Sequence, residues 1–382
     1  MPASELSQLA ETVWASDQFS ARRLGRYFLV ELRSPHRVLS TSAHCGGEQD
    51  GVRFLANHQS CEGRGDSERQ ALIAEMGLVR YHREVCAELG IDPDRTALMG
   101  TAASMACVTH RHCEFGDLRA DAFVSAGVKG NATTAGDPAR WVETENGWAE
   151  VSRYEGTINV ILVLGFSLSP SALASAVVTM TEAKSAALAE LAVPSLSSSS
   201  VATGTGTDQF CLAHPLDSRG KPKESTSTHV KAGEIIGVAV KEAVKEALRW
   251  QNGLEPSYTR GFFHALGRFG LTQERVLEYL RGELSEREFA LLADNLQAVF
   301  YEPGVGAAAH ALAAVLDRVR CGTLPEAAVG EALRQQAACL ACCVAARPQN
   351  WPVLYAALSC RDEDPLGLIL RAVAQGWKAK WA

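Results

Sequence analysis

The stretch Val201-Ala202-Thr203-Gly204-Thr205-Gly206-Thr207-Asp208 places three threonine hydroxyls, two glycines and one carboxylate within eight residues. It follows the serine run 197–200 and leads into the apolar segment 209–213, which has the character of a buried strand. The pattern predicts a loop that feeds a strand and offers hydrogen-bond donors and one ionisable acceptor to a small polar ligand. A flexible Gly/Thr linker is the alternative, but linkers seldom run straight into an apolar strand.

Length and composition indicate a globular protein with room for two domains. The 382 residues are 47% hydrophobic and 21% charged, and the net charge is -7. No basic cluster is present to neutralise a row of phosphates, so we expect no nucleic-acid partner. The first residues, 1–5, lack the features of a signal peptide, and the longest apolar runs, such as 158–166, are too short to span a bilayer. We therefore expect a cytoplasmic protein without a membrane span.

The eleven cysteines fit free thiols in a reducing compartment, because no pair of cysteine clusters has zinc-site spacing. Cys339, Cys342 and Cys343 share one helical stretch, and we expect them to pack in a helical core. His110 and His112 alternate on a predicted strand and so face the same side, where they could bind a metal with His44 or Cys45. Hydrogen-bonded structural histidines are the more common case, and we assign no metal.

The order of elements predicts an α/β (or α+β) domain over residues 1–252, a mixed sheet flanked by helices. We expect a helix over 5–25 and a hairpin of strands 27–32 and 37–42 joined by Ser34-Pro35-His36. Further strands are predicted at 52–58, 96–102, 106–112, 122–127 and 141–152, with a helix over 68–90. The apolar run 160–165 predicts a strand buried on both faces, and Ser169-Pro170 predicts the start of a long helix.

The character of the sequence changes near residue 253. An amphipathic helix is predicted over 235–250, and beyond 255 almost no strand pattern remains. Helices are expected near 271–282, 285–299, 305–320, 325–346 and 365–379, separated by turns that contain Gly or Pro. Residues 255–382 are therefore predicted to form a separate all-α domain, for which we expect a role in interaction or as a lid.

Several polar residues stand where predicted strands begin or end. Ser42 and His44 follow the second strand, and Thr157 and Asn159 stand at the entrance of the apolar strand. Glu182 and Lys184 lie two residues apart on the long helix, about 200° round its axis, so they cannot both face one pocket in the same way. A solvated surface histidine is the plain alternative for His44.

The order and the residues of these segments resemble the CbiZ family, the adenosylcobinamide amidohydrolases. The matching segments are Leu39-Ser40 with Gly46-Gly47, Gly100-Thr101-Ala102-Ala103, Ala126-Gly127-Val128 with Asn131-Ala132 and Gly136-Asp137, Gly156-Thr157-Ile158-Asn159, Thr181-Glu182-Ala183-Lys184, Ala202 to Asp208, and Gly233-Glu234-Ile235-Ile236-Gly237. The resemblance covers residues 27–250 and leaves out the helical tail. It implies hydrolysis of the amide between a corrin-ring propionyl side chain and aminopropanol, giving adenosylcobyric acid for coenzyme B12 salvage or remodelling.

The residues are compatible with that chemistry, which needs an attacking group, oxyanion donors and an acid for the departing amine. We expect Asp208 or Glu182 as general base, Lys184 or His44 as the acid, and Thr207 among the catalytic donors. The candidate substrate-binding residues are Ser42, His44, Thr101, Asn131, Asp137, Thr157, Asn159, Thr203 and Thr205. Two alternatives stay open: Asp208 caps backbone N–H groups, or a threonine among 133, 134, 203, 205 and 207 is a nucleophile.

The expected partner is therefore a small cobalt-containing corrinoid, bound as substrate, and the sequence indicates no required cofactor. A non-catalytic corrinoid-binding or regulatory protein is the alternative function. A nucleotide hydrolase is disfavoured because the Gly-Thr-Gly-Thr segment lacks the Walker pattern. Assembly into a homo-oligomer is a further expectation that the sequence leaves open.

Overall fold

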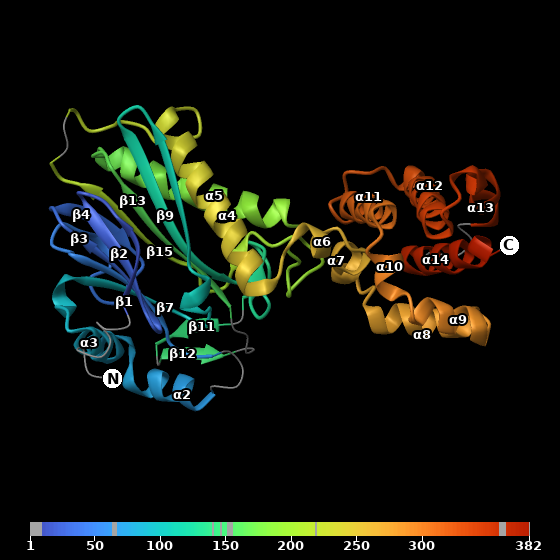
Figure 1. The fold of residues 1–382 in the computed structure, drawn as a ribbon, viewed down its shortest axis with the longest axis horizontal. Coiled ribbons are helices and arrows are strands. Elements are labelled where there is room, and N and C mark those ends of the chain that lie inside the picture. Colours follow the sequence, from blue (N-terminus) through green and yellow to red (C-terminus); the bar gives the residue numbers. More distant parts are fainter. Residues whose placement is uncertain are drawn as a thin grey trace. The chain divides into compact units, whose positions relative to one another are not determined.

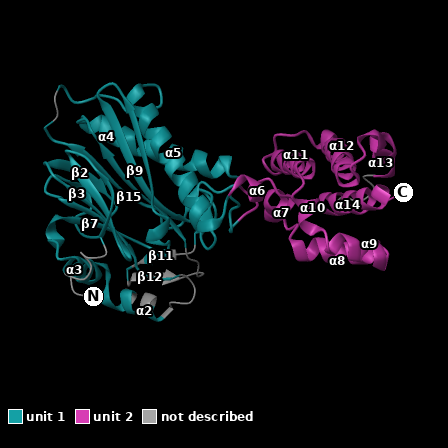
Figure 2. Cartoon of the chain, viewed as in Figure 1, with its two compact units in different colours: residues 1–197, 201–254 teal, residues 198–200, 255–382 magenta. Residues whose placement is uncertain are grey.

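The computed structural model describes residues 10–62, 67–139, 141–145, 147–150, 156–217, 220–358 and 364–381. The chain divides into two compact units (Figures 1 and 2). The first contains residues 1–197 and 201–254, and the second contains 198–200 and 255–382. Three residues that precede the Thr/Gly stretch thus belong to the second unit.

The first unit is built on two mixed sheets. The five-stranded sheet has the order β1-β2-β3-β6-β7, with only β6 and β7 parallel. Its strands are β1 (Ala10–Ala15), β2 (Phe19–Leu24), β3 (Tyr27–Leu32), β6 (Phe54–Gln59) and β7 (Thr96–Thr101). Helices α2 (Ser67–Met76) and α3 (Leu78–Leu89) and the 3-10 turn η2 (Pro93–Arg95) connect β6 to β7.

The six-stranded sheet has the order β5-β4-β15-β13-β9-β8, with only β13 and β15 parallel. Its strands are β4 (His36–Ser40), β5 (Gly47–Gln49), β8 (Thr109–Phe115), β9 (Leu118–Gly127), β13 (Thr157–Leu164) and β15 (Gln209–Pro215). The short strands β10 (Ala132–Thr133) and β14 (Gly204–Thr205) pair with each other, and β11 (Trp141–Thr144) forms a hairpin with β12 (Gly147–Glu150). The 3-10 turn η3 (Met105–Cys107) precedes β8.

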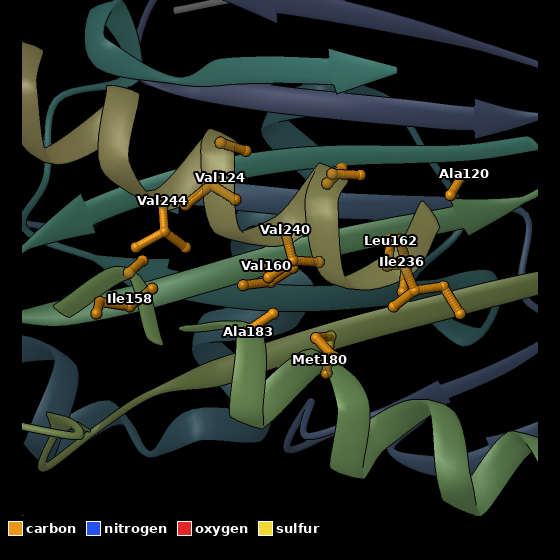
Figure 3. Close-up of a cluster of buried hydrophobic side chains, with 14 of the residues drawn as sticks. Ala120, Val124, Ile158, Val160, Leu162, Met180, Ala183, Ile236, Val240 and Val244 are labelled. Atoms are coloured by element: carbon orange, nitrogen blue, oxygen red, sulfur yellow. The ribbon is translucent and has the colours of Figure 1, made fainter. Parts of the chain in front are cut away.

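Alternating side chains of β13 enter two different cores. Ile161 and Val163 pack between the two sheets with Phe28 and Val30 of β3. Ile158, Val160 and Leu162 face the opposite side, where Figure 3 shows them with residues of α4 (Pro170–Glu190) and α5 (Lys231–Asn252). All eight residues of β13 are buried, which confirms the predicted strand with two covered faces.

A third cluster lies on the outer side of the five-stranded sheet, where Tyr27 and Leu29 of β3 pack with Val85 of α3. The layers are therefore helix α3, five-stranded sheet, six-stranded sheet and helices α4 and α5. This order confirms an α/β unit of mixed sheet flanked by helices, with two sheets where one was expected. Helix α4 begins as predicted, because the Ser169 hydroxyl accepts from the backbone N–H of Ala172 at 3.2 Å and Pro170 occupies the first turn.

The helix predicted over 5–25 is wrong for the described part, since 10–24 forms the antiparallel strands β1 and β2. The Ser16 hydroxyl accepts from the N–H groups of Gln18 at 3.2 Å and Phe19 at 3.3 Å and so closes the turn between them. Phe19 and Ala21 alternate inward with the period of a strand. Residues 5–9 lie outside the described residues.

The predicted hairpin of 27–32 with 37–42 is also wrong, because β3 and β4 belong to different sheets. Pro35 O accepts from the N–H of Leu216 at 3.0 Å, so Ser34-Pro35 carries the chain across to β15. Val30 and Val38 then meet in the core between the sheets. The strand expected over 141–152 is a hairpin of two strands as far as residue 150, and 151–152 lie outside the described residues.

The second unit is helical in every described element. Its helices are α6 (Pro256–Thr259), α7 (Phe262–Leu266), α8 (Gln273–Glu283), α9 (Glu286–Ala293), α10 (Leu296–Phe300), α11 (Pro303–Arg320), α12 (Glu326–Ala345), α13 (Trp351–Ala357) and α14 (Pro365–Trp381), with 3-10 turns η4 (Gly267–Phe269) and η5 (Pro348–Asn350). The five predicted helices are confirmed, with 285–299 divided between α9 and α10. Cys342 is buried in the core of this unit, with Cys343 packed against it, and the ten described cysteines are free. Across the described ranges, no helix combines the length and apolar character needed to cross a membrane.

Candidate active site

Polar segments from both sheets converge at one end of the first unit. β13 and β15 start there side by side, with Asn159 opposite Gln209. β9 is antiparallel to β13 and ends there, with Gly127 opposite Thr157. β7 reaches the same place, because Gly100 N donates to the Gln209 Oε1 atom at 3.2 Å. The Thr/Gly stretch leads into β15 and so lies at this end.

Asp208 is the most fully bonded carboxylate of this region. Its Oδ1 accepts from the backbone N–H of Ile158 at 3.0 Å and from the Thr205 hydroxyl. Its Oδ2 accepts from the Thr205 N–H at 3.1 Å and from the Lys184 ammonium. The carboxylate therefore ties the Thr/Gly stretch to the first residues of β13 and pairs with a lysine of α4.

The Lys184–Asp208 ion pair is largely shielded from water, with 14% and 17% of the two side chains exposed. Charges in such a place interact more strongly than on an open surface. An ammonium has three N–H donors, and Asp208 accepts one of them, so Lys184 can also donate to a bound ligand. The pair therefore places a positive charge beside the Thr/Gly stretch in a place partly shielded from water.

Gly204 is the residue that lets the pair form. A Cβ atom at this position would lie 2.8 Å from Lys184 Nζ and closer still to Asp208 Oδ2. Gly204 does not have a positive φ, so the requirement for glycine comes from space rather than from backbone conformation.

A second polar group surrounds Thr207. Its exposed side chain donates from the hydroxyl to Gly156 O at 2.8 Å and accepts a long hydrogen bond, 3.5 Å, from Asn131 Nδ2. Asn131 Nδ2 also donates to Gly156 O at 3.0 Å. Thr207 O accepts from the Thr157 hydroxyl at 2.6 Å. The structure thus brings Asn131, Thr157 and Thr207 together beside Asp208.

Asn159 extends this group into the space between the sheets. Its Nδ2 donates to Asn57 Oδ1 and to Gly100 O, each at 3.0 Å, and its Oδ1 accepts from Thr157 at 3.0 Å. Asn57 Nδ2 in turn donates to the Ser125 hydroxyl at 2.8 Å. Asn57 and Ser125 were not predicted as site residues; the only signal for Asn57 is an amide within the apolar strand β6.

Asp137 and Thr203 shape the loop beside the pair. Asp137 Oδ2 accepts from the Ser195 hydroxyl at 2.6 Å and from the Thr134 N–H at 2.9 Å. The Thr203 hydroxyl accepts from the Ala135 N–H at 2.8 Å. Both side chains therefore fix the segment that carries β10 against the segment that carries β14.

The remaining candidates contact other parts of the unit. The Ser42 hydroxyl donates to His44 O at 2.6 Å and accepts from the Leu98 N–H at 3.0 Å. His44 Nε2 lies 2.9 Å from Asp94 Oδ1. The Thr101 hydroxyl accepts from the Ala103 N–H at 2.9 Å. Within the described ranges, none of these side-chain hydrogen bonds reaches Asp208 or Lys184.

Glu182 is exposed on α4, whereas Lys184 is partly buried against Asp208. This difference follows from their separation of two residues along the helix. His110 Nε2 and His112 Nδ1 lie 2.8 Å and 2.9 Å from Asp121 Oδ1, which confirms the expectation of hydrogen-bonded structural histidines.

A separate hollow of about 800 Å³ is present in the helical unit, lined by Ser257, Tyr258, Arg260, Gln297, Ala298, Tyr301, Glu302 and Pro303. It contains none of the predicted site residues. The hydrogen-bonded groups at the start of β13 and β15 are therefore the better candidate for the chemistry.

Comparison with known proteins shows the family to which the first unit belongs. Residues 12–256 match the family described as adenosylcobinamide amidohydrolase, CbiZ. The uncharacterized protein MJ1613 of Methanocaldococcus jannaschii is 34% identical over 236 residues, which are 59% of this chain and 87% of that protein. The chain belongs to the adenosylcobinamide amidohydrolase family, as its sequence motifs predicted. Membership of this family implies a hydrolase, and residues beyond 256 lie outside the match.

Proposed function

We propose that the protein hydrolyses the amide that joins the corrin-ring propionyl side chain to aminopropanol in adenosylcobinamide. The family match over residues 12–256 carries the proposal. Water adds to the amide carbon, the carbon–nitrogen bond breaks, and the nitrogen leaves with a proton as 1-amino-2-propanol. The acid product is adenosylcobyric acid, so the reaction would serve salvage or remodelling of corrinoids for coenzyme B12.

Lys184 is the residue we propose for the electrophilic side of this reaction. Its ammonium is held by Asp208 and can donate to the oxygen that becomes negative in the tetrahedral intermediate. It can also supply the proton that the departing nitrogen needs. His44, the other candidate acid, is bonded to Asp94 of η2, a carboxylate that is 73% exposed and so is far less shielded from water than Asp208.

Asp208 is proposed as a positioning carboxylate. A general base needs an oxygen that can accept a proton from water, and both oxygens of Asp208 already accept two hydrogen bonds each. Its role is to hold Lys184 and Thr205 in place. The exposed Thr207 hydroxyl donates its proton to Gly156 O and accepts from Asn131 Nδ2, and its remaining oxygen lone pair can accept from the N–H of the substrate amide.

A threonine nucleophile is the second mechanism, and one observation favours it. The Thr205 hydroxyl donates directly to the Asp208 carboxylate, an arrangement that can activate a hydroxyl for attack. The acyl group would then be held on Thr205 until water releases it. Because Thr205 is buried, this mechanism also requires the substrate carbonyl to reach a covered atom.

The test is incubation with adenosylcobinamide, followed by mass spectrometry of the corrinoid products. We expect adenosylcobyric acid from the wild type, and less than about 1% of that rate from Lys184→Met, since removal of one oxyanion donor typically costs 100-fold or more. Lys241→Met, on the exposed side of α5, is the control and should keep full activity. Tight binding without any product would instead show a corrinoid-binding protein that does not turn over.

The same reaction separates the two mechanisms. In a denaturing quench during turnover, a threonine nucleophile gives a fraction of protein with the mass of one added acyl group, and Thr205→Val removes it. Direct attack by water gives protein of unchanged mass throughout. A single full-length band on a denaturing gel would exclude any version in which the chain cleaves itself to expose a threonine.

A further inference from the structure

The segment Ser198–Ser200 leaves the first unit and belongs to the helical one. The residues on either side of this segment pair with each other inside the first unit. Pro194 and Val201 form a β-bridge, and Ala202 N donates to Val193 O at 2.8 Å. Only six residues lie between Pro194 and Val201. The helical unit therefore holds the chain immediately before the Thr/Gly stretch begins.

The side chain of Arg268, in η4, binds the backbone of the segment Ser198–Ser200. Its guanidinium donates to Ser199 O and, through two nitrogens, to both carboxylate oxygens of Asp317 at 2.7 Å and 2.6 Å. Only 5% of the Arg268 side chain is exposed. Two parallel hydrogen bonds fix a guanidinium in one orientation, so the nitrogen that serves Ser199 is aimed by Asp317.

Arg320 holds the same segment by a side chain. Its Nη1 donates to the Ser200 hydroxyl at 2.6 Å, and its Nη2 lies 3.6 Å from Asp317 Oδ1. Asp317 on α11 therefore organises two arginines, each of which binds one serine of the segment. The three charged residues lie outside the region that matches the family, which ends at residue 256.

The position of Ser198–Ser200 affects the Thr/Gly stretch because the two segments are continuous in the chain. Val201 follows Ser200 directly, and its carbonyl accepts from the Thr134 hydroxyl at 2.9 Å. Thr203 N donates to Thr133 O at 3.0 Å, and β14 then carries Gly204 and Thr205 to Asp208. A change in how the segment is held thus enters the Thr/Gly stretch at Val201, seven residues before Asp208, which contacts Lys184.

We propose that Arg268, Asp317 and Arg320 are positioning residues that order the stretch 201–208 through Ser198–Ser200. The helical unit then contributes to turnover and is not a dispensable appendage. Its place in the sequence makes it a natural point of regulation, because anything that displaces the two arginines from the serines loosens the site. The catalytic part of this inference rests on the proposed amidohydrolase function.

The experiment compares Arg268→Ala and Ser200→Ala with wild type, and uses Arg287→Ala, an exposed arginine on α9, as the control. Amide hydrogen exchange of peptides covering 201–208 is the first readout, and it needs no substrate. We expect the amides of 201–208 to exchange faster in both variants than in wild type, and at the wild-type rate in Arg287→Ala. Ser200→Ala removes one hydroxyl and leaves Arg268 in place, so it tests the inference even if Arg268→Ala does not fold.

Steady-state kinetics with adenosylcobinamide is the second readout. We expect kcat to fall by about 10-fold or more in Arg268→Ala, with a smaller change in KM, because small displacements of catalytic groups cost rate. Arg268→Lys keeps the charge without the fork and should recover part of the loss. Unchanged exchange over 201–208 in Ser200→Ala, or wild-type kcat in a variant whose exchange has increased, overturns the proposal. A wild type without hydrolytic activity contradicts the proposed function alone, and the exchange result still decides the role of the arginines.

Discussion

Gly204→Ala is the smallest change that tests the construction of the site. The added methyl would occupy the space in which Lys184 and Asp208 meet, 2.8 Å from the nitrogen and in contact with Asp208 Oδ2. Alanine can adopt the backbone conformation of Gly204, which has no positive φ. Any effect therefore comes from displacement of the ion pair.

The expected loss of stability follows from how deeply the pair is buried. Breaking a fully buried ion pair costs about 3–5 kcal/mol, and overpacking adds about 1–3 kcal/mol when neighbours cannot move. Because 14% and 17% of the two side chains are exposed, they can relax partly toward water, and we expect a net loss of about 2–4 kcal/mol. For a unit of this size that lowers Tm by about 5–15 °C.

Differential scanning calorimetry and the hydrolysis assay measure the two consequences. Gly237→Ala on α5 is the matched control, since a Cβ there meets nothing within 4 Å and alanine favours a helix by about 1 kcal/mol. We expect Gly237→Ala to be equal to wild type or slightly more stable, with full activity. A Gly204→Ala protein with wild-type Tm and activity would refute the view that this glycine makes room for the pair.

Three further predictions concern buried groups. Asn159→Leu should lower the free energy of unfolding by about 2–3 kcal/mol in urea titrations, because the Asn57 and Gly100 oxygens lose their donor; stability within 0.5 kcal/mol of wild type would contradict this by the same principle. Burial lowers the pKa of His36, so below about pH 6.5 the unfolded chain binds a proton that the folded one does not, and stability should fall with pH more steeply in wild type than in His36→Asn. Burial raises the pKa of Cys211 to about 12, so iodoacetamide should label exposed Cys321 first and Cys211 only after unfolding, as read by peptide mass spectrometry.

Elements with a strong local pattern could be predicted from the sequence. The apolar run of β13 is buried on both faces, and Ser169-Pro170 begins α4, because both features depend on neighbouring residues. Pairing between distant strands could not be predicted in the same way. The two sides of Ser34-Pro35 look like one hairpin. Only the pairing of β4 with β15, whose residues lie 171 to 179 positions further along the chain, shows that the second strand belongs to another sheet.

The residues of the candidate site could be named from the sequence, but only some of the contacts among them could be predicted. Helical spacing separates Glu182 from Lys184, and the structure places Lys184 against Asp208. Asn57 carries no motif, and its link to Asn159 depends on the packing of two sheets. The serine run 197–200 also gives no sign that Ser198–Ser200 belongs to the helical unit. The arginines that bind it, Arg268 and Arg320, lie 69 and 120 residues away from their serine partners.

The balance of protons explains why one held lysine can be enough for the proposed reaction. The attacking water must lose a proton and the departing nitrogen must gain one, so no net proton is consumed at the amide. Lys184 can give its proton to the nitrogen and recover one from the oxygen of the attacking water once the carbon–nitrogen bond has broken. That cycle needs an ammonium that stays in place while its charge changes, and the four hydrogen bonds at Asp208 provide a fixed partner. In this proposal the Asp208 carboxylate acts by keeping Lys184 in a fixed position. The proposed contacts at Ser198–Ser200 serve the same purpose, because they order the segment that leads to Asp208.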